Sequence, residues 1–451
     1  MAWVSGERDQ LRITLSTGDR WAALRRTDLC IPWREISSVE RVAEPFRLVH
    51  GLRAPGLALP WRTKIGTWRS TGRKTFAVTH AGAPGIRILL HGNGFAEILV
   101  SLPEPDAAIK TIRAGISNPH TGEPVERLLT FRSAGTELAG TALLPGAGEP
   151  RIAAAVIVTG SGKLDRNGSD RRARIDVSRQ LANSLLAHGI ATLRYDKRGV
   201  AASGGDYYRT GLQDNIDDAI AAAETLAQQP ECAGIPLLAI GHSEGAMIVT
   251  SLAAGSATRL GGVVLLAGPA STGEQTLQWQ AARIAPTLPT PVRLILRLLH
   301  TDPVQRQRTF SKKIRETKQD SMRMGGVRIN ARWFRELLDF DPVPLLSAIT
   351  VPVLAITGDK DLQVDPADLD IIAATVPGPV STNRMTNLTH ILRLDPAEPT
   401  LGAYRKLIRQ PVAPAVLQTV AEWIEHIADA DSELRRPAAA GRPRPADIAP
   451  R

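Results

Sequence analysis

The chain of 451 residues is poor in cysteine and in long apolar runs. Its two cysteines, Cys30 and Cys232, lie far apart and outside any ligand-like spacing, so we expect neither a disulfide framework nor a metal centre. No run of about 18 apolar residues occurs, which argues against a membrane-spanning helix. Charged residues also interrupt the N-terminal segment where a secretory signal would be apolar, and we therefore expect a cytoplasmic protein.

Aromatic residues are scarce as well, at 4% of the chain, although the formal net charge is +10. The basic excess is divided between two regions. Residues 1–120 hold 17 Lys and Arg against 10 Asp and Glu, and residues 283–340 hold 13 against 5. Nucleic-acid-binding surfaces combine such charge with aromatic side chains on which bases stack, so we expect no nucleic-acid partner. The charge indicates a solvated basic surface, and attraction to an anionic substrate or a membrane is the alternative.

The first quarter of the chain has the pattern of a small β-rich domain. Short apolar runs alternate with turn-forming residues and predict short strands. The predicted strands cover residues 11–15, 75–79, 87–91 and 97–102. Pro105, between two acidic residues, suits the first turn of a closing helix. With the stretches IPWREISSVERV and FRLVHGLRAPG, this order resembles the pleckstrin-homology-like domains of bacterial proteins and implies such a domain over residues 1–116.

The same resemblance implies a candidate partner, because basic side chains of a peripheral domain can contact anionic lipid. Peripheral membrane contact through residues 1–116 is therefore one hypothesis, and contact with another protein is the alternative. The candidate lipid contacts are Arg25, Arg26, Arg62, Lys64, Arg69, Arg73 and Lys74.

Beyond a predicted linker at residues 117–124, apolar strands alternate with helical segments, which is typical of parallel βα units. The predicted strands are residues 127–132, 137–144, 153–158, 191–195, 237–240, 262–266, 352–357 and 380–385, and the helices are residues 177–187, 213–228, 246–254 and 416–427. An insertion at about residues 270–345, with helices at 292–299 and 331–338, predicts a helical cap over the sheet edge. Residues 429–451 are rich in Pro, Ala and Arg and predict a disordered tail.

The pentapeptide Gly241–Gly245, GHSEG, follows a predicted strand and opens a predicted helix. In that context Ser243 projects from a sharp, strained turn, and the glycines on either side leave room for the strand and the helix. The backbone N–H of Glu244 then lies at the start of the helix, where it can stabilise an oxyanion. We predict that Ser243 is the nucleophile of a serine hydrolase; an ordinary helix N-cap is the alternative.

Such a serine needs an acid and a base that follow it in the order Ser, Asp, His. The strand at 352–357 runs directly into acidic residues, of which the candidates are Asp359, Asp361 and Asp365. Of the nine histidines, His390 follows these acids on the loop after the last strand. His426 lies on a predicted surface helix, and His242 is too close to Ser243 in sequence to act as its base. We therefore predict His390 as the base.

The loop after the strand at 153–158 reads TGSGKLDRNG. It resembles the loop G-S-G-x-x-D-R-x-G of bacterial esterase-like members of the α/β-hydrolase superfamily, with Thr159–Gly160 in place of the common His-Gly pair. A phosphate-binding loop is disfavoured because the Gly-Lys-Ser/Thr ending is missing. The segment Asp196–Ser203, DKRGVAAS, resembles a structural turn of the same superfamily, in which Ala201 replaces a usual glycine.

This resemblance covers residues 125–428 and implies an α/β-hydrolase fold, with a mostly parallel sheet, flanking helices and a helical cap. It further implies that the backbone N–H of Ser161 is the second oxyanion donor. The Gly-x-x-Asp pattern of the superfamily selects Asp361 as the acid, with Asp359 and Asp365 as competitors. In the implied mechanism Ser243 attacks the substrate, His390 transfers the proton, and Asp361 orients the imidazole.

The predicted activity is hydrolysis of a small-molecule carboxylic ester through an acyl-enzyme, without a cofactor or a metal. A thioesterase is one alternative, because the basic cap would suit an anionic acyl carrier. An aminopeptidase would instead need acidic residues beside the substrate amine, and the cap has few. A non-catalytic binding protein on the same scaffold is the third alternative, which the intact set of Ser243, Asp361 and His390 disfavours.

Overall fold

The computed structural model describes residues 2–435, apart from residues 7–9, 26, 60, 71–72, 92–93, 118–123, 147, 172, 256–258 and 299–301. The chain divides into two compact units, Met1–Gly122 and Glu123–Arg451. The predicted linker at 117–124 falls almost wholly outside the described residues. We therefore treat each unit by itself.

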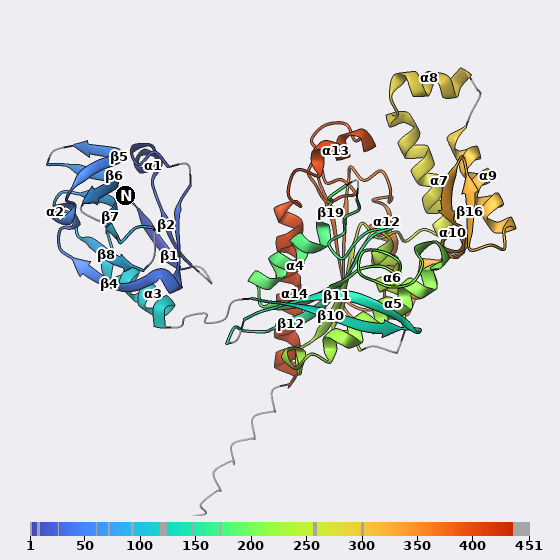
Figure 1. Ribbon diagram of the computed structural model, residues 1–451, viewed down its shortest axis with the longest axis horizontal. Helices are drawn as coiled ribbons and strands as arrows, with labels where there is room; N and C mark the ends of the chain where they lie inside the picture. The colour runs from blue at the N-terminus through green and yellow to red at the C-terminus, as the bar shows by residue number, and fades with distance from the viewer. Residues whose placement is uncertain are drawn as a thin grey trace, which may run out of the picture. The chain divides into compact units, whose positions relative to one another are not determined.

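The first unit is β-rich, as the sequence predicts (Figure 1). One sheet has the order β1-β2-β3 and the other the order β4-β8-β9-β7-β6-β5. The strands are β1 (Trp3–Gly6), β2 (Gln10–Thr14), β3 (Leu29–Pro32), β4 (Ile36–Val42), β5 (Leu52–Leu59), β6 (Thr63–Ser70), β7 (Arg73–His80), β8 (Gly85–Leu90) and β9 (Glu97–Ser101), and the helices are α1 (Thr17–Ala22), α2 (Pro45–Leu48) and α3 (Pro105–Ser117). The fully buried Phe76, Ile98 and Ile112 join the second sheet and α3 in one core. The likeness to pleckstrin-homology domains stays a prediction.

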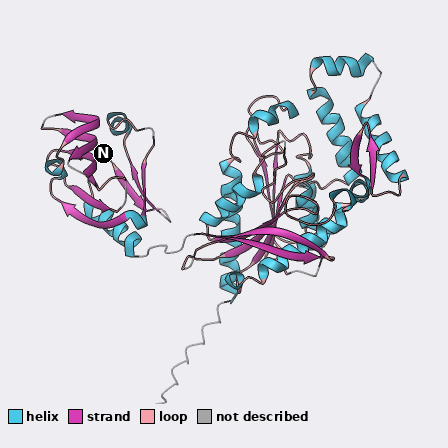
Figure 2. Cartoon of the chain, in the orientation of Figure 1, coloured by secondary structure: helices cyan, strands magenta, loops and turns pink. Residues whose placement is uncertain are grey.

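The second unit is built on an eight-stranded sheet of order β10-β11-β13-β12-β14-β15-β18-β19 (Figure 2). Its strands are β10 (Val125–Ser133), β11 (Thr136–Leu144), β12 (Ala153–Val158), β13 (Ile190–Tyr195), β14 (Leu237–His242), β15 (Gly262–Leu266), β18 (Val353–Gly358) and β19 (Val380–Met385). The first two form an antiparallel hairpin, and the six from β13 to β19 are parallel. Strands β12, β15 and β18 are predominantly apolar because both faces of the sheet are covered.

Helices cover the two faces of this sheet with separate apolar cores. One face is covered by α5 (Leu212–Ala227), α6 (Glu244–Ala254), α11 (Pro342–Ser347) and α12 (Asp368–Thr375), and the other by α4 (Val177–Ala187) and α14 (Pro414–Arg435). Leu181 and Leu185 of α4 are both fully buried, and their four-residue spacing places them on the same side of the helix. All parallel strands therefore end at one edge of the sheet, where the loops that follow them meet.

The insertion after β15 forms the predicted cap, but it is not wholly helical. Its elements are α7 (Gly273–Ile284), α8 (Thr290–Leu298), α9 (Pro303–Glu316), β16 (Ser321–Met324), β17 (Val327–Asn330) and α10 (Ala331–Leu338). Strands β16 and β17 pair as a hairpin whose turn is Gly325–Gly326, with φ of 54° and 80°. Such a two-residue turn needs positive φ at both positions, which glycine adopts without a steric penalty. The sequence analysis missed this signal.

The predicted start of the tail at residue 429 is wrong. Helix α14 continues to Arg435, because Ile424 and Ala428 still pack on the sheet and the following residues include good helix formers. Residues 436–451 lie outside the described part of the chain. Among the described residues, no helix has the length and apolar content needed to cross a membrane.

Candidate active site

Ser243 lies in the sharp turn between β14 and α6, with φ 57° and ψ −118°. This strained conformation is held by close packing of the two glycines of the pentapeptide. A Cβ on Gly241 would lie 2.1 Å from the carbonyl oxygen of Gly245, and a Cβ on Gly245 would lie 2.2 Å from that of Val158. No side chain fits at either position. The backbone is therefore forced to present Ser243 at the end of the strand.

The structure brings Ser243, His390 and Asp361 together in one hydrogen-bonded chain. His390 Nε2 lies 2.9 Å from Ser243 Oγ, and His390 Nδ1 lies 2.8 Å from Asp361 Oδ2. The side chains of His390 and Asp361 are almost completely buried. Asp361 Oδ1 also accepts hydrogen bonds from the backbone N–H groups of Gln363 and Val364, at 2.7 and 2.9 Å. These bonds fix the carboxylate beside the imidazole.

The other two candidate acids, Asp359 and Asp365, hydrogen-bond to backbone N–H groups of loops and turns and not to His390. Asp359 Oδ1 accepts a hydrogen bond from the backbone N–H of Asn387 at 2.7 Å, and Asp365 Oδ1 accepts one from that of Ala367 at 3.0 Å. Among the described residues, the carboxylate paired with His390 is that of Asp361.

Two further residues hold the loop that carries His390. His242 Nε2 donates a hydrogen bond to the His390 carbonyl oxygen at 2.8 Å. Burial, followed by the proximity of His390, lowers the pKa of His242 to about 4, so its ring is neutral near pH 7. Arg393 is fully buried and donates to the carbonyl oxygens of Ile391 and Ile175; burial lowers its pKa to about 10. Neither residue was predicted from the sequence to belong to the site.

The loop with the predicted oxyanion donor Ser161 is anchored by Asp196. Asp196 Oδ1 accepts from the backbone N–H of Arg166 at 2.7 Å, and Asp196 Oδ2 pairs with the Arg166 guanidinium at 2.6 Å. Because Asp196 is 1% exposed, this charge-assisted pair is well shielded from water. The segment DKRGVAAS thus has the structural role expected of it. Ala201 has φ 46°, which explains why glycine is favoured at that position.

Glu244 has a buried ionic partner that the sequence analysis missed. Its Oε2 pairs with Lys197 Nζ at 2.9 Å, while its Oε1 accepts from Asn215 Nδ2 and Trp333 Nε1, both at 3.0 Å. Trp333 comes from cap helix α10, so this carboxylate links the cap to the residue that follows Ser243. A charged residue at the start of a buried helix, together with the lysine of DKRGVAAS, was the available signal.

Ser243 lines a cavity of about 490 Å³ under the cap. Both predicted oxyanion residues, Ser161 and Glu244, also line it. Its apolar wall includes Leu277 and Phe334 from the cap. No group of three or more His, Cys, Asp and Glu suited to a metal ion occurs among the described residues. Because an imidazole lies within hydrogen-bond distance of the Ser243 hydroxyl, the arrangement can carry out nucleophilic chemistry.

Comparison with known proteins agrees with this geometry. A family model described as "Serine aminopeptidase, S33" matches residues 174–397. Together with the sheet order and the turn at Ser243, this match decides the fold. The second unit has the α/β-hydrolase fold.

Among characterised relatives, esterase EstD of Thermotoga maritima is 27% identical over 274 residues, which are 60% of this chain and 61% of EstD. The chain thus spans less than two thirds of that relative's length. Solved structures with a similar chain path include Est1E of Butyrivibrio proteoclasticus with bound ferulic acid (TM-score 0.45, 15% identity, 68% of this chain and 99% of that one). Proline iminopeptidase of Mycobacterium smegmatis is another (TM-score 0.46, 15% identity, 67% and 99%). The family match and the esterase relative support the predicted hydrolase.

Some of the candidate lipid contacts of the first unit have partners within the unit, and others are exposed. Lys64 Nζ donates to the carbonyl oxygens of Phe46 and Val49 at 3.1 and 2.8 Å, so its ammonium group is engaged within the unit. Lys74 Nζ and Arg25 Cζ lie over the rings of Phe95 and Phe76. The side chains of Arg62, Arg69 and Arg73 are exposed, and Arg26 lies outside the described residues. Contact with lipid stays a prediction, which now rests on these exposed arginines.

Proposed function

We propose that the α/β-hydrolase unit hydrolyses a carboxylic ester through a triad of Ser243, His390 and Asp361. The observation that carries the proposal is the hydrogen-bonded chain from Ser243 Oγ through the His390 ring to Asp361. Ser243, at one end of this chain, lines a cavity of about 490 Å³. A serine hydroxyl is a weak nucleophile on its own, and it becomes an effective one when a neighbouring imidazole accepts its proton.

In the proposed reaction His390 Nε2 takes the proton of Ser243 as Oγ attacks the ester carbonyl carbon. The oxygen of the tetrahedral intermediate accepts hydrogen bonds from the backbone N–H groups of Ser161 and Glu244. The intermediate collapses when His390 donates that proton to the departing alcohol. A water molecule, deprotonated by His390, then cleaves the acyl-enzyme and regenerates Ser243. Asp361 stays ionised throughout and stabilises the imidazolium.

The charges in the cavity favour an ester over a peptide with a free amine. Among the described residues that line the cavity, Glu244 is the one acid, and its carboxylate is already paired with Lys197. The other charged lining residues are Lys163 and Arg328, which would repel a substrate ammonium group. This arrangement argues against the aminopeptidase alternative. A thioester remains the second candidate bond, because its acyl transfer uses the same groups.

The test is labelling with a fluorophosphonate and hydrolysis of a p-nitrophenyl ester series from acetate to octanoate, with Ser243→Ala as the variant. Wild-type protein should be labelled, and the substitution should lower kcat by at least about 10⁴-fold, the scale on which a serine nucleophile acts. Ser381→Ala, at an exposed serine of β19, is the matched control and should retain labelling and turnover. Labelling that persists in Ser243→Ala, or its absence in the wild type, would refute the proposal. Acyl-CoA thioesters tested in parallel distinguish the two candidate bonds.

A further inference from the structure

We propose that Lys163, Tyr208 and Arg328 form an anion clamp at the mouth of the cavity, which binds a carboxylate or phosphate group carried by the substrate. The proposal rests on the hydrolase function above and specifies its substrate class. The ester lies at Ser243, and the clamp holds a negatively charged group elsewhere on the same molecule.

The three residues come from separate parts of the unit and meet at one aromatic ring. Lys163 lies on the loop that carries Ser161, Tyr208 on the short 3₁₀ turn Tyr207–Arg209, and Arg328 on cap strand β17. Lys163 Nζ lies 4.1 Å and Arg328 Cζ 4.3 Å from the centre of the Tyr208 ring. All three residues line the cavity that contains Ser243.

The charge balance of this cluster is positive. The carboxylate of Glu244 is matched by the buried ammonium group of Lys197. Asp206, which is about half exposed, has its carboxylate 3.9 Å from the Arg328 guanidinium, a weak pairing at that distance and exposure. Contact with an aromatic ring stabilises an exposed cation only weakly, so it does not replace an anion. Two cations on one ring also repel each other, and a bound anion removes that repulsion.

The two cations have complementary geometries for an anion. A guanidinium offers parallel N–H groups that match the oxygens of a carboxylate or phosphate, and an ammonium group adds a compact charge. Both side chains are exposed, whereas Ser243 is partly buried. The leucine, tryptophan and phenylalanine side chains that line the same cavity suit an uncharged segment of substrate. The structure thus fits an ester with an anionic end.

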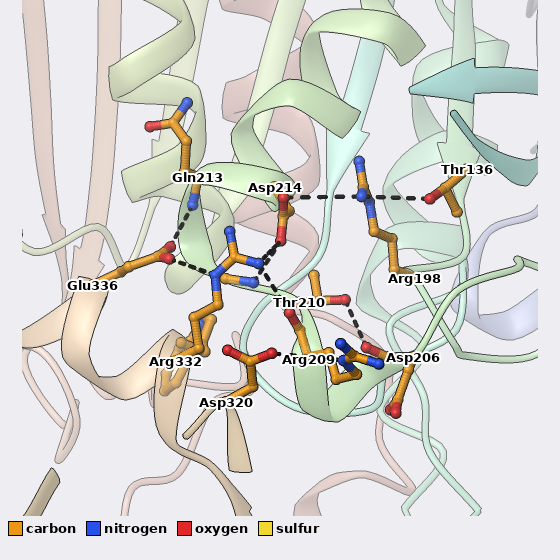
Figure 3. Close-up of polar contacts among 12 residues, drawn as sticks. Thr136, Arg198, Asp206, Arg209, Thr210, Gln213, Asp214, Asp320, Arg332 and Glu336 are labelled. Atoms are coloured by element: carbon orange, nitrogen blue, oxygen red, sulfur yellow. Dashed lines mark hydrogen bonds and ion pairs between the residues drawn. The ribbon is translucent and has the colours of Figure 1, made fainter. Parts of the chain in front are cut away.

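The clamp is fixed in place by polar contacts between the cap and the turn at Tyr207–Arg209. Asn330 Nδ2 donates to the carbonyl oxygens of Tyr207 and Thr210, at 2.6 and 2.7 Å. Arg332 donates to the carbonyl oxygen of Arg209 at 3.1 Å, and Arg209 pairs with Asp320 (Figure 3). Because the ring and the cap strand are joined this way, Tyr208 and Arg328 keep their relative positions before substrate binds.

The test compares p-nitrophenyl esters of the same chain length. The glutarate half-ester carries a carboxylate, the pentanoate ester is neutral, and the 4-phosphonobutyrate ester carries a phosphonate. Wild-type protein should have a higher kcat/KM for the anionic esters than for the pentanoate, and added salt should reduce the difference. The better of the two anionic esters identifies which group the clamp prefers.

Lys163→Gln and Arg328→Gln should each lower the ratio of anionic to neutral kcat/KM about tenfold, equivalent to about 1.4 kcal/mol. Lys163→Arg and Arg328→Lys keep the charge and should retain most of the preference. Arg308→Gln removes an exposed cap arginine that does not line the cavity and should leave the ratio unchanged. Fluorophosphonate labelling of Ser243 shows whether each variant is folded.

Two outcomes would overturn the clamp while the hydrolase function stands. One is a wild-type protein that hydrolyses the pentanoate through Ser243 without preferring either anionic ester. The other is an equal loss on charged and neutral esters in the glutamine variants. If no ester is hydrolysed and Ser243 is not labelled, the function itself fails, and the clamp fails with it.

Discussion

At the residue scale, His242 lies beside the proposed base His390. It hydrogen-bonds the His390 carbonyl oxygen, and the two rings lie 5.2 Å apart. A protonated His242 would place a positive charge beside the ring that becomes an imidazolium in the proposed reaction. The low pKa of His242 keeps that charge away from His390 across the neutral pH range.

This low pKa predicts a pH-dependent stability. An unfolded histidine titrates near 6.5, whereas burial lowers the pKa of His242 to about 4 in the folded chain. Between these values the unfolded state holds a proton that the folded state lacks, so stability falls as the pH falls. The contribution of His242 to this loss between pH 7 and pH 5 is about 2 kcal/mol.

His242→Gln is the variant that isolates this effect, since its amide can still donate to the His390 carbonyl oxygen. Urea denaturation at pH 7 and pH 5 should show a smaller pH-dependent loss of unfolding free energy in the variant than in the wild type. The prediction is wrong if both proteins lose the same amount.

At the element scale, cap helix α10 is joined to helices α5 and α6 by polar side chains. Arg332 pairs with Asp214 at 3.1 Å, and Glu336 accepts from the backbone N–H of Gln213 at 2.9 Å (Figure 3). Trp333 reaches further, to the buried pair of Glu244 and Lys197. The position of the cap is thus tied to Glu244, the residue that follows Ser243 and whose N–H is the proposed oxyanion donor.

The buried pair predicts strong energetic coupling. Glu244→Gln or Lys197→Met alone leaves one charge buried without its partner, which costs about 3 kcal/mol or more. The double variant removes both charges, so it should be destabilised by clearly less than the sum of the single variants. Unfolding free energies of the four proteins give the coupling. Additive losses would show that the two side chains do not depend on each other.

The sequence predicted elements best where burial is uniform. Residues 153–158 and 262–266 match β12 and β15 because every side chain there is buried and apolar. Hairpin β16–β17 was missed because its strands are short and mostly only partly buried, which leaves little apolar alternation, and because its Gly325–Gly326 turn was not recognised. The C-terminal end of α14 was missed because its last turns, up to Arg435, no longer show the apolar spacing of a buried helix face.

The same contrast holds at the site. Ser243, the acidic candidates and His390 follow strand ends in a fixed order, so the sequence predicted them as candidates, and the resemblance to the α/β-hydrolase superfamily selected Asp361 among the acids. The pairing of Glu244 with Lys197 and the anchoring of the His390 loop by Arg393 depend on which segments the fold brings together. Glu244 and Lys197 are 47 residues apart, so each segment shows a charge in an apolar setting but not which residue pairs with it.

At the scale of the whole molecule, each unit has a core of its own. The buried cluster around Phe76 and Ile98 contains residues of the first unit alone, and the two clusters on the large sheet contain residues of the second unit alone. Their stabilities should therefore be separable.

Accordingly, we expect residues 124–435, expressed alone, to fold and to react with fluorophosphonate at Ser243. Thermal unfolding of the full chain should contain a transition that coincides with that of the shorter protein. Failure of residues 124–435 to fold, while the full chain reacts normally, would show that the first unit is required for the second to fold.

The hairpin β16–β17 also has an evolutionary consequence. Gly241 and Gly245 tolerate no side chain, so these two positions of the turn that presents Ser243 are closed to mutation. Arg328 stands on an exposed hairpin that pairs only with itself among the described strands, so it can vary without disturbing the sheet. A lineage, or a laboratory selection, could therefore acquire new substrates through the hairpin while the chemistry beneath it stays constant.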